Sequence, residues 1–479
     1  MTARHATPAL LYEQVAAKLE ALIEQGAFHP GQRIPSIREM SRQSGTSVNT
    51  VMGAYARLEA QRLIEARPQS GYYVCSRLPE PDGVAISKHE TRRIVPRTVA
   101  VSDLPTHIIR TFADKSLVPL GQSGPDPRLL PVDKLTRMLA AATRRRSVES
   151  VCSEPSEGHL QLREAIARRS LAQGCCLGPD DIVITSGCME AITLALQATC
   201  RAGDTVAIAT PVFYNFLNSI QWLGLNVLEL PSCPRNGVSL DVLAYAIRRH
   251  RIGACLLIPN FSNPLGSLMP DENKRALAEL LARHEIPLIE DDVYGDLSFA
   301  QARSNTVKAY DRKGLVLLCS SFTKTLAPGY RVGWIAPGRF QEKVQQLKSL
   351  FSVTTASPTQ FAVAEFLTNG GYDRHVRALR HAYAAQVALF RESIGRYFPA
   401  GTRVTRPAGG SVVWLELPDS VDTVTLWERA LRKRIAIAPG VLFSTTNEFR
   451  NCLRLNTAYW SNDVEKALQV LGRLSKSMV

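Results

Sequence analysis

The feature that most constrains this chain is an alternation of apolar and amphipathic segments that begins near Val118 and continues to the C-terminus. The apolar segments typical of strands lie at 181–185, 205–209, 254–259, 286–290 and 315–319. Segments with helical periodicity separate them. Near-continuous apolar strands joined through helices indicate a parallel sheet with helices on both faces. The sequence therefore predicts an α/β domain over residues 118–479.

Composition and charge exclude several classes of protein. Of the 479 residues, 45% are hydrophobic and 21% are charged, as in ordinary folded proteins. No apolar run approaches the roughly 18 residues that a membrane span requires, and Met1–Ala9 lacks the pattern of a secretory signal. The ten cysteines are scattered without CxxC or Cys/His zinc spacing. We expect a cytoplasmic protein with reduced cysteines and no metal site.

Residues 1–77 carry a different pattern, that of short amphipathic helices. One helix is expected at 12–23, a second after the capping residue Ser36, and a third at 47–61, followed by a hairpin that ends at 71–74. The buried stripe of the third helix is predicted to hold Val48, Val51, Tyr55 and Leu58. Residues 78–117 lack this periodicity, and we expect a linker there with one short helix near 106–112.

The spacing of these helices is typical of a helix–turn–helix, in which the second helix of the motif enters the major groove of DNA by its first turn. Ser47, Asn49 and Thr50 lie in that turn and are short polar residues able to contact bases or phosphates. The net charge of +14 makes nucleic acid a candidate partner. However, residues 1–79 hold nine basic and six acidic residues, a net charge of only +3. The motif, rather than the charge, supports DNA binding.

The N-terminal residues resemble the winged helix of the GntR family of bacterial transcription regulators. The resemblance is carried by Tyr12-x-Gln14, Pro30-Gly31-x-x-Ile34-Pro35-Ser36-x-Arg38, Ser47-x-x-Thr50, Tyr55-x-x-Leu58 and Ser70-Gly71. It implies contacts with double-stranded DNA from Arg33, Arg38, Ser47, Asn49, Thr50 and Gly71. The family often has Arg inside the turn at 47–50, where this chain has Val48 and Asn49.

The strongest chemical signal is the segment Ser320–Arg331, which follows the predicted strand at 315–319. Lys324 stands there among hydroxyl side chains and is followed by Arg331. This combination suits a carbonyl cofactor that carries a phosphate, because the amine forms a Schiff base while hydroxyls and the guanidinium hold the phosphate. Ser321-x-x-Lys324 also matches a serine β-lactamase motif, but the companion motifs Ser-Asp-Asn and Lys-Thr-Gly are absent. We therefore reject that interpretation.

Further motifs follow the other predicted strands. The segment 185–188 opens a helix whose main-chain N–H groups suit a phosphate, and Phe213 offers a ring for stacking. Asn263 offers an amide to a ring hydroxyl, and Asp291 offers a carboxylate to a pyridine nitrogen. Open α/β sheets bind ligands at the carboxyl ends of their strands. We therefore expect these motifs to meet in one site.

Residues from about 118 to 475 resemble fold-type I pyridoxal 5'-phosphate enzymes of the class I/II aminotransferase kind. The resemblance implies a large, mostly parallel sheet domain with a smaller C-terminal α+β subdomain, and Lys324 as the catalytic residue that carries the internal aldimine. It implies that Asp291 pairs with the pyridinium. Asp292 is the rival, although adjacent residues at a strand end face opposite ways. The other implied cofactor contacts are Ser186, Gly187, Cys188, Phe213, Asn263, Tyr294, Ser321, Thr323 and Arg331.

The same resemblance assigns Arg454 to the carboxylate of an amino-acid-like ligand, and a guanidinium suits bidentate binding of that group. One position departs from the family pattern. Such proteins often carry a Tyr shortly before the Gly of a Pro-x-x-Gly segment, where it reaches the phosphate of the partner subunit. The segment Cys152–Gly158 has no Tyr, which puts cofactor affinity and catalytic competence in question.

A winged helix followed by such a fold is typical of the MocR subfamily of GntR regulators. This resemblance implies a head-to-tail homodimer whose DNA-reading domains are exchanged between subunits. Three functions remain open. The first is a regulator that senses an amino acid, amine or B6 vitamer through the aldimine at Lys324. The second is a working aminotransferase with an accessory DNA-binding domain. The third is a DNA-binding protein with an inert enzyme-like domain. The intact lysine makes the third the weakest.

Overall fold

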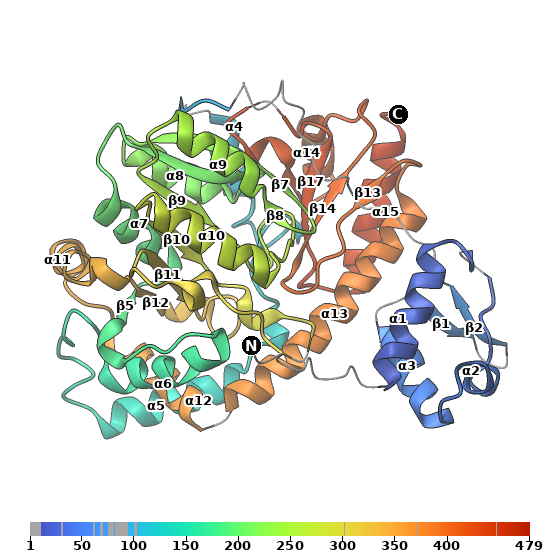
Figure 1. Ribbon diagram of the computed structural model, residues 1–479, viewed down its shortest axis with the longest axis horizontal. Coiled ribbons are helices and arrows are strands. Elements are labelled where there is room, and N and C mark those ends of the chain that lie inside the picture. The colour runs from blue at the N-terminus through green and yellow to red at the C-terminus, as the bar shows by residue number, and fades with distance from the viewer. Residues whose placement is uncertain are drawn as a thin grey trace, which may run out of the picture.

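The computed structural model describes residues 11–29, 32–60, 63–67, 70–74, 81, 94–99, 103–300, 302–369, 371–446 and 448–479. A small N-terminal unit stands beside a much larger one (Figure 1). The motif residues Pro30 and Gly31, and much of the predicted linker, lie outside the described residues. In the part of the chain that is described, no helix is long and apolar enough to cross a membrane.

The small unit is a winged helix, as the sequence predicts. It consists of α1 (Leu11–Glu24), α2 (Ile37–Ser44), α3 (Val48–Ala60), β1 (Ile64–Arg67) and β2 (Gly71–Val74). Its core joins all three helices to the hairpin through Val15, Leu19, Ile23, Met40, Val51, Tyr55, Leu58, Ile64 and Val74. The prediction that Val48 is buried is wrong, since 44% of this residue is exposed. It occupies the first turn of α3, which extends beyond the packed core.

Local capping sets the tight turn between α2 and α3. The Ser36 hydroxyl accepts a hydrogen bond from the Glu39 main-chain N–H at 3.3 Å, and the Glu39 carboxylate accepts one from the Ser36 N–H at 3.4 Å. Gly45, with φ of 64°, ends α2 in the left-handed conformation that glycine adopts without strain. The Ser47 hydroxyl then accepts from the Thr50 N–H at 3.1 Å and starts α3. These contacts fix the direction of α3 relative to α2.

A nine-stranded sheet forms the centre of the large unit. Its order is β3 (Arg97–Thr98), β7 (Asn226–Cys233), β6 (Thr205–Thr210), β9 (Ala254–Leu257), β10 (Leu288–Asp291), β11 (Val316–Ser321), β12 (Gly333–Ala336) and β5 (Val183–Thr185), with β8 (Gly237–Val238) paired to β7. The five predicted strands all run in one direction. The unpredicted strand β12 runs antiparallel between β11 and β5.

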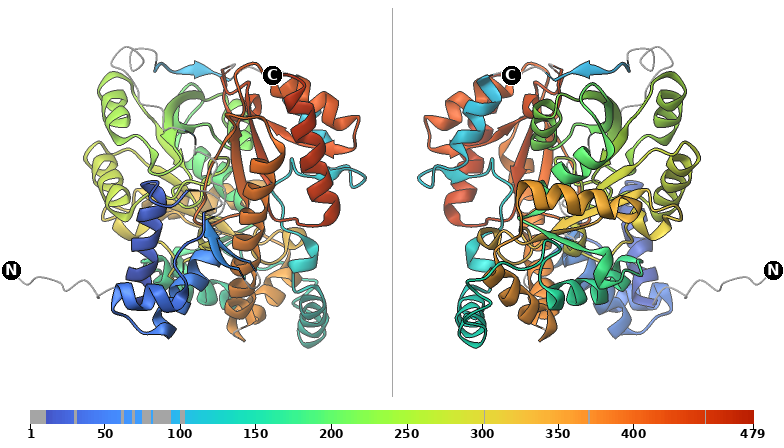
Figure 2. Two further views of the ribbon diagram at one scale, coloured as in Figure 1. Left: turned by 90° about the vertical axis from the view of Figure 1, so that its right-hand side faces the viewer. Right: turned by 90° about the vertical axis from the view of Figure 1, so that its left-hand side faces the viewer.

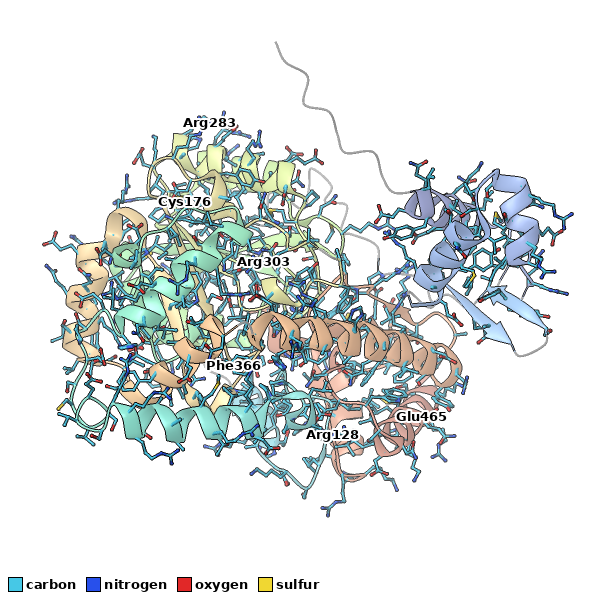
Figure 3. The ribbon with its side chains drawn as sticks, turned by 90° about the horizontal axis from the view of Figure 1, so that it is seen from below. Arg128, Cys176, Arg283, Arg303, Phe366 and Glu465 are labelled. Atoms are coloured by element: carbon cyan, nitrogen blue, oxygen red, sulfur yellow. The ribbon has the colours of Figure 1, made fainter. Side chains whose placement is uncertain are left out.

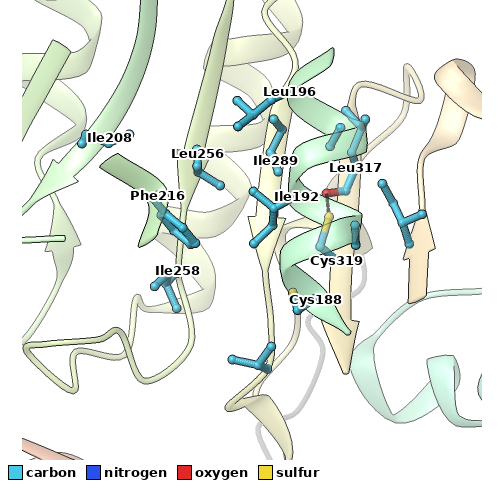
Figure 4. Close-up of a cluster of buried hydrophobic side chains, with 14 of the residues drawn as sticks. Cys188, Ile192, Leu196, Ile208, Phe216, Leu256, Ile258, Ile289, Leu317 and Cys319 are labelled. Carbon is cyan, nitrogen blue, oxygen red and sulfur yellow. Dashed lines mark hydrogen bonds between the residues drawn. The ribbon is translucent and has the colours of Figure 1, made fainter. Parts of the chain in front are cut away.

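Helices cover both faces of this sheet. On one face α7 (Cys188–Thr199) and α8 (Tyr214–Trp222) pack on β9, β10 and β11, and Figure 4 shows Ile192 and Leu196 of α7 against Ile289 and Leu317. The other face is covered by α5 (Val132–Arg145), α6 (Leu160–Ser170), α9 (Leu240–Arg249), α10 (Asp271–Arg283) and α12 (Ser357–Thr368). Successive strand residues therefore enter different cores, as alternation of side chains along a strand requires.

A smaller C-terminal subdomain completes the large unit. Its antiparallel sheet has the order β13 (Arg403–Val404), β14 (Val412–Glu416), β17 (Cys452–Asn456) and β16 (Ala438–Pro439). It packs on α14 (Thr423–Leu431) and α15 (Asn462–Lys476). The long helix α13 (Gly371–Tyr397) places its first half in the core of the large sheet and its second half in that of the subdomain, and it spans the face seen in Figure 3. It therefore joins the two.

The described part of the segment between the units packs on the large unit. The strand β3 pairs with β7, and β4 (Val118–Pro119) pairs with β15 (Ile435–Ala436). Between them lies α4 (Asp103–Thr111), the short helix that the sequence predicts at 106–112. Its His107 ring lies 5.5 Å from the Trp427 ring of α14, measured between centroids, and Figure 2 shows α4 in cyan beside the red C-terminal helices.

An ion pair joins the two units. A guanidinium nitrogen of Arg406, in the turn between β13 and β14, lies 3.2 Å from a carboxylate oxygen of Glu20 on α1. Both side chains keep about a quarter to a third of their surface in contact with water, and ion pairs of this kind contribute about 0–1 kcal/mol. The pair therefore holds the winged helix only weakly against the large unit.

Candidate cofactor site and DNA-reading surface

The carboxyl ends of the parallel strands bring the predicted cofactor residues to one edge of the sheet. Asp291 ends β10, Lys324 lies just beyond β11, and Asn263 follows β9. Phe213 is the residue before α8, directly after β6, and its ring lies 4.8 Å from that of Tyr214. The structure thus places side chains from four neighbouring strand ends around a common edge.

The amine of Lys324 is held by a residue that sequence reasoning missed. Its Nζ donates hydrogen bonds to the Ser123 carbonyl oxygen at 2.7 Å and to the Ser123 hydroxyl at 3.2 Å. The same amine lies 5.6 Å from the centre of the Tyr294 ring. Ser123 belongs to the loop after β4, far from Lys324 in sequence, and no motif marked it. Lys324 is thus positioned over the phenol predicted to share its site.

Asp291 and its rival Asp292 face opposite sides of the sheet. Asp291 Oδ1 accepts from the Val293 N–H at 3.1 Å and from the Cys188 thiol at 3.5 Å. Asp292 instead forms an ion pair with Arg303 and accepts from the Asn260 amide at 2.8 Å. The Asp292 carboxylate is therefore neutralised by Arg303 on the side of the sheet away from Asp291. This favours Asp291 as the group that faces the cofactor.

Burial and neighbouring charges set opposite pKa values for Asp291 and Asp296. Desolvation raises the pKa of Asp291 to about 6, although the Val293 N–H and Lys324 act in the opposite direction. Burial also raises the pKa of Asp296, but Arg303 and Arg169 outweigh it and lower that pKa to about 2. One carboxyl group thus titrates near neutrality, whereas the other stays ionised as part of a structural ion pair.

Arg454 is fully buried and lies beside Asn263. Its guanidinium donates to the Asn263 amide oxygen at 3.2 Å and to the Gly121 carbonyl oxygen, and it lies 5.3 Å from the centre of the Phe443 ring. Its Nε has no hydrogen-bond partner among the described residues. The Asn263 amide nitrogen in turn donates to the Tyr294 hydroxyl at 3.4 Å. The predicted carboxylate group and the predicted ring contacts therefore form one hydrogen-bonded chain.

The N-terminus of α7 packs tightly against Arg331. The Arg331 guanidinium donates to the Ser186 carbonyl oxygen at 2.9 Å. Gly187 has φ of 87°, and a Cβ at this position would overlap that guanidinium. The Ser186 N–H donates to Glu190, and the Gly187 N–H donates to the Thr185 carbonyl oxygen at 2.9 Å. Phosphate contacts through these two N–H groups would compete with bonds already present.

The hydroxyl groups around Lys324 differ in their partners. The Ser321 hydroxyl accepts from the Thr323 N–H at 3.4 Å. The Thr323 hydroxyl is buried and has no hydrogen-bond partner among the described residues, which is costly unless a further group binds there. Cys188 was predicted to hold the phosphate, but its buried side chain donates to Asp291, so only its main chain remains for that role.

The predicted DNA-reading residues lie on the surface of the winged helix. Ser47, Asn49, Arg33 and Arg38 are exposed, and Thr50 and Gly71 are partly buried. The Arg33 side chain lies against Gly71, and Arg33 pairs with Tyr73 of β2. Sequence reasoning missed Val48 and Met52, which are 44% and 51% exposed on α3. Exposed apolar side chains on a recognition helix suit the methyl groups of thymine.

The raised pKa of Asp291 predicts a stability difference that depends on pH. A pKa of about 6 in the folded state, above the ordinary 3.8, means that the folded chain binds this proton more tightly, so the contribution is favourable at low pH and is lost as pH rises through 4 to 6. In cofactor-free protein, Asp291→Asn should raise the free energy of unfolding by about 2–3 kcal/mol at about pH 8 and by little at about pH 4.

Urea unfolding at both pH values measures this difference. The matched control is Asp180→Asn. The Asp180 side chain is 98% exposed, and its ion pair with Arg163 is of the surface kind that contributes about 0–1 kcal/mol, so its replacement should change stability little at either pH. Equal stabilities of Asp291→Asn and the unchanged protein at the higher pH would contradict the buried, destabilised carboxylate.

Comparisons with known proteins identify both units. The chain matches the family model "Aminotransferase class I and II" over residues 131–471 and the model "Bacterial regulatory proteins, gntR family" over residues 11–74. It is similar to the solved structure of LysN, the α-aminoadipate aminotransferase of Thermus thermophilus, at 27% identity and a TM-score of 0.72. The similarity covers 79% of this chain and 96% of that one. That structure contains N-(5'-phosphopyridoxyl)-L-leucine.

This fold implies pyridoxal 5'-phosphate as the cofactor, and the residues present fit it. Lys324 supplies a primary amine. The two donors to Asp291 found among the described residues both use Oδ1, which leaves Oδ2 for a ring nitrogen. The buried Thr323 hydroxyl without a partner lies in the same loop as Arg331 and suits a phosphate oxygen. A carbonyl group, a pyridine nitrogen and a phosphate each therefore meet a suitable residue.

Relatives along the whole chain share the two-unit architecture. The chain is 38% identical to the "Uncharacterized HTH-type transcriptional regulator YjiR" of Escherichia coli, over 96% of this chain and 98% of that protein. It is also 38% identical to YdcR of the same organism, which bears the same description, over 97% of this chain and 98% of that protein. The chain belongs to the MocR subfamily of GntR-type transcription regulators, in which a winged helix precedes an aminotransferase class I and II domain.

Proposed function

We propose that this protein binds double-stranded promoter DNA through α3 and the wing, and that an amino acid, amine or B6 vitamer bound at the Lys324 site sets its DNA affinity. The observation that carries the proposal is the environment of Arg454. It is fully buried, its Nε has no partner among the described residues, and it adjoins Asn263 and Tyr294. A buried guanidinium with an unused donor suits a carboxylate ligand.

Each site residue has a distinct role in this proposal. Pyridoxal 5'-phosphate supplies an aldehyde that condenses reversibly with primary amines, and a ring that withdraws electrons when its nitrogen is protonated. Asp291 would hold a proton at that nitrogen, and Lys324 would supply the amine that binds the aldehyde carbon and for which an incoming amine competes. Arg454 binds the carboxylate, and the Tyr294 hydroxyl and the Asn263 amide contact the ring oxygen. The Thr323 hydroxyl and Arg331 bind the phosphate.

The proposal includes a homodimer. The segments 148–152 and 350–357 carry exposed apolar side chains and touch each other. The Ser357 hydroxyl of the second segment donates a hydrogen bond to the Cys152 carbonyl oxygen of the first at 3.1 Å. The exposed side chains are Val148, Val151, Leu350, Phe351 and Val353, each at least 60% exposed. Grouped apolar side chains at a surface are typical of a protein interface. This edge includes the segment 152–158 that, in the family pattern, approaches the cofactor of the partner subunit.

The direct test is a gel-shift assay on the DNA upstream of the gene, with and without pyridoxal 5'-phosphate and a panel of amines, amino acids and vitamers. At least one compound should shift the DNA affinity by a factor of about 5 or more, as is common for coupled sites. Lys324→Ala should bind the same DNA but lose both the visible absorbance of bound cofactor and the response. Unchanged affinity with every compound would refute ligand sensing.

The DNA contacts have a separate signature in their salt dependence. Arg38 is exposed on α2 next to the recognition helix and is proposed to contact a phosphate. Arg38→Ala should weaken binding about equally for all DNA sequences and lower the slope of log affinity against log salt by about 1, because one counterion fewer is released. The control is Arg396→Ala on α13, which is exposed on the large unit. An unchanged slope in Arg38→Ala would contradict the phosphate contact.

A second candidate function is a working aminotransferase. It is favoured by the joint presence of Lys324, Asp291, Asn263, Tyr294 and Arg454 at one edge of the sheet, since binding an amine through the cofactor uses the same atoms as the first half of a transamination. Single-turnover absorbance separates the two functions. Conversion of bound pyridoxal phosphate to pyridoxamine phosphate by an amino acid would establish catalysis, whereas its absence with all of them would exclude it.

A further inference from the structure

Two cationic side chains of the site, Lys324 and Arg454, donate hydrogen bonds to the loop of residues 120–125, here named the 120–125 loop. The Arg454 guanidinium donates to the Gly121 carbonyl oxygen, and Lys324 Nζ donates to the carbonyl oxygen and the hydroxyl of Ser123. The loop also accepts a bond at Gly124 from the Asn456 amide at 3.0 Å. The two groups proposed to bind the carboxylate and the amine of a ligand therefore also determine where this loop lies.

The 120–125 loop is in direct contact with the segment that leads from the winged helix. Phe112 follows α4, and its ring packs so closely on Gly121 that a side chain at position 121 would overlap it. The centre of the same ring lies 6.3 Å from that of the Tyr214 ring. Burial raises the pKa of the Tyr214 phenol, and the nearby charge of Arg454 lowers it. Phe112 therefore contacts the site on one side and belongs to the end of α4 on the other.

We infer that the 120–125 loop and Phe112 transmit ligand occupancy at the Lys324 site to α4, and through it to the chain that carries the winged helix. This inference rests on the proposed function and supplies its route.

Exchange of Lys324 for another amine would change the hydrogen bonds that Lys324 donates to Ser123 of the loop. If a primary amine took the place of Lys324 at the cofactor carbon, a carbon–nitrogen double bond to the incoming nitrogen would replace the one to Lys324, and the two hydrogens of the incoming amine would pass to Lys324. The released amine can then donate to both oxygens of Ser123, at the distances of 2.7 and 3.2 Å seen here. With its nitrogen bonded to the cofactor, Lys324 would carry at most one hydrogen there and could not donate to both oxygens.

A carboxylate on the same ligand would act on the hydrogen bond from Arg454 to Gly121. Arg454 Nη2 donates to Gly121, and the adjacent Nε has no partner among the described residues. A carboxylate that binds Nε and Nη2 together competes with the Gly121 carbonyl oxygen, and it is the stronger acceptor because it is ionised. A ligand with both groups therefore strengthens the hold on Ser123 and weakens the hold on Gly121. Because Phe112 packs on Gly121, the change reaches the end of α4.

Phe112→Ala tests this route in the full-length protein loaded with pyridoxal phosphate. The probe is the L-amino acid that gives the largest absorbance change in a panel of all twenty. Two quantities are measured, the absorbance midpoint with that amino acid and the affinity for labelled upstream DNA with and without it. The absorbance midpoint should stay within about twofold, whereas the coupling factor, commonly about 5 to 150, should fall toward 1.

Phe340→Ala is the matched control, since Phe340 is, like Phe112, a half-buried ring. Phe340 packs on the large-sheet core near α11 (Gln341–Phe351), whereas Phe112 packs on the core of the C-terminal subdomain. The control variant should keep the coupling of the unchanged protein. Ser123→Ala removes one of the two acceptors for Lys324 and should therefore lower the coupling factor. This variant tests the route if Phe112→Ala does not fold.

The outcomes separate the two claims. If the unchanged protein shows coupling and Phe112→Ala and Ser123→Ala show the same coupling, the 120–125 loop is not the route, and the proposed function stands. If the unchanged protein responds to no amino acid in DNA affinity although its absorbance changes, sensing of amino acids is refuted, and the 120–125 loop as its route is refuted with it.

Discussion

The direction of five strands is the constraint on which the rest of the structure depends. Because β5, β6, β9, β10 and β11 run the same way, their carboxyl ends meet at one edge of the sheet. An amine, a carboxylate, an amide and a helix N-terminus from distant parts of the sequence are thereby brought together. The crossover helices that parallel strands require also bury both faces, so the edge remains the place where polar side chains gather.

Burial sets the protonation and hydrogen bonding of the charged side chains at this edge, and it makes the cofactor-free protein less stable. Asp291 is buried with a raised pKa, and Arg454 is buried with an unused Nε, so both are less favourable in the cofactor-free protein than in water. Nearby, Asp292 and Asp296 are neutralised by Arg303 and help to hold the fold. The charged groups that lack such partners are the ones to which we assign a ligand.

Much of this architecture could be predicted from the sequence, because strands, helix caps and the motifs after strand ends are local. Ser36 caps α2 as its spacing indicates, and Asp291 differs from Asp292 as strand alternation requires. Ser123 and the Cys188 thiol were missed, since each contacts a residue more than a hundred positions away. Val48 was misassigned because helical periodicity does not show where the core ends.

The central claim is that one chain links an amine site to a DNA-reading surface, and thermodynamic linkage makes that claim directly measurable. The measurement is the absorbance midpoint for an amino-acid ligand in the cofactor-loaded protein, with and without saturating operator DNA. If the sites are coupled, DNA shifts this midpoint by the same factor by which the ligand shifts DNA affinity. An identical midpoint with and without DNA would show that the two units act independently.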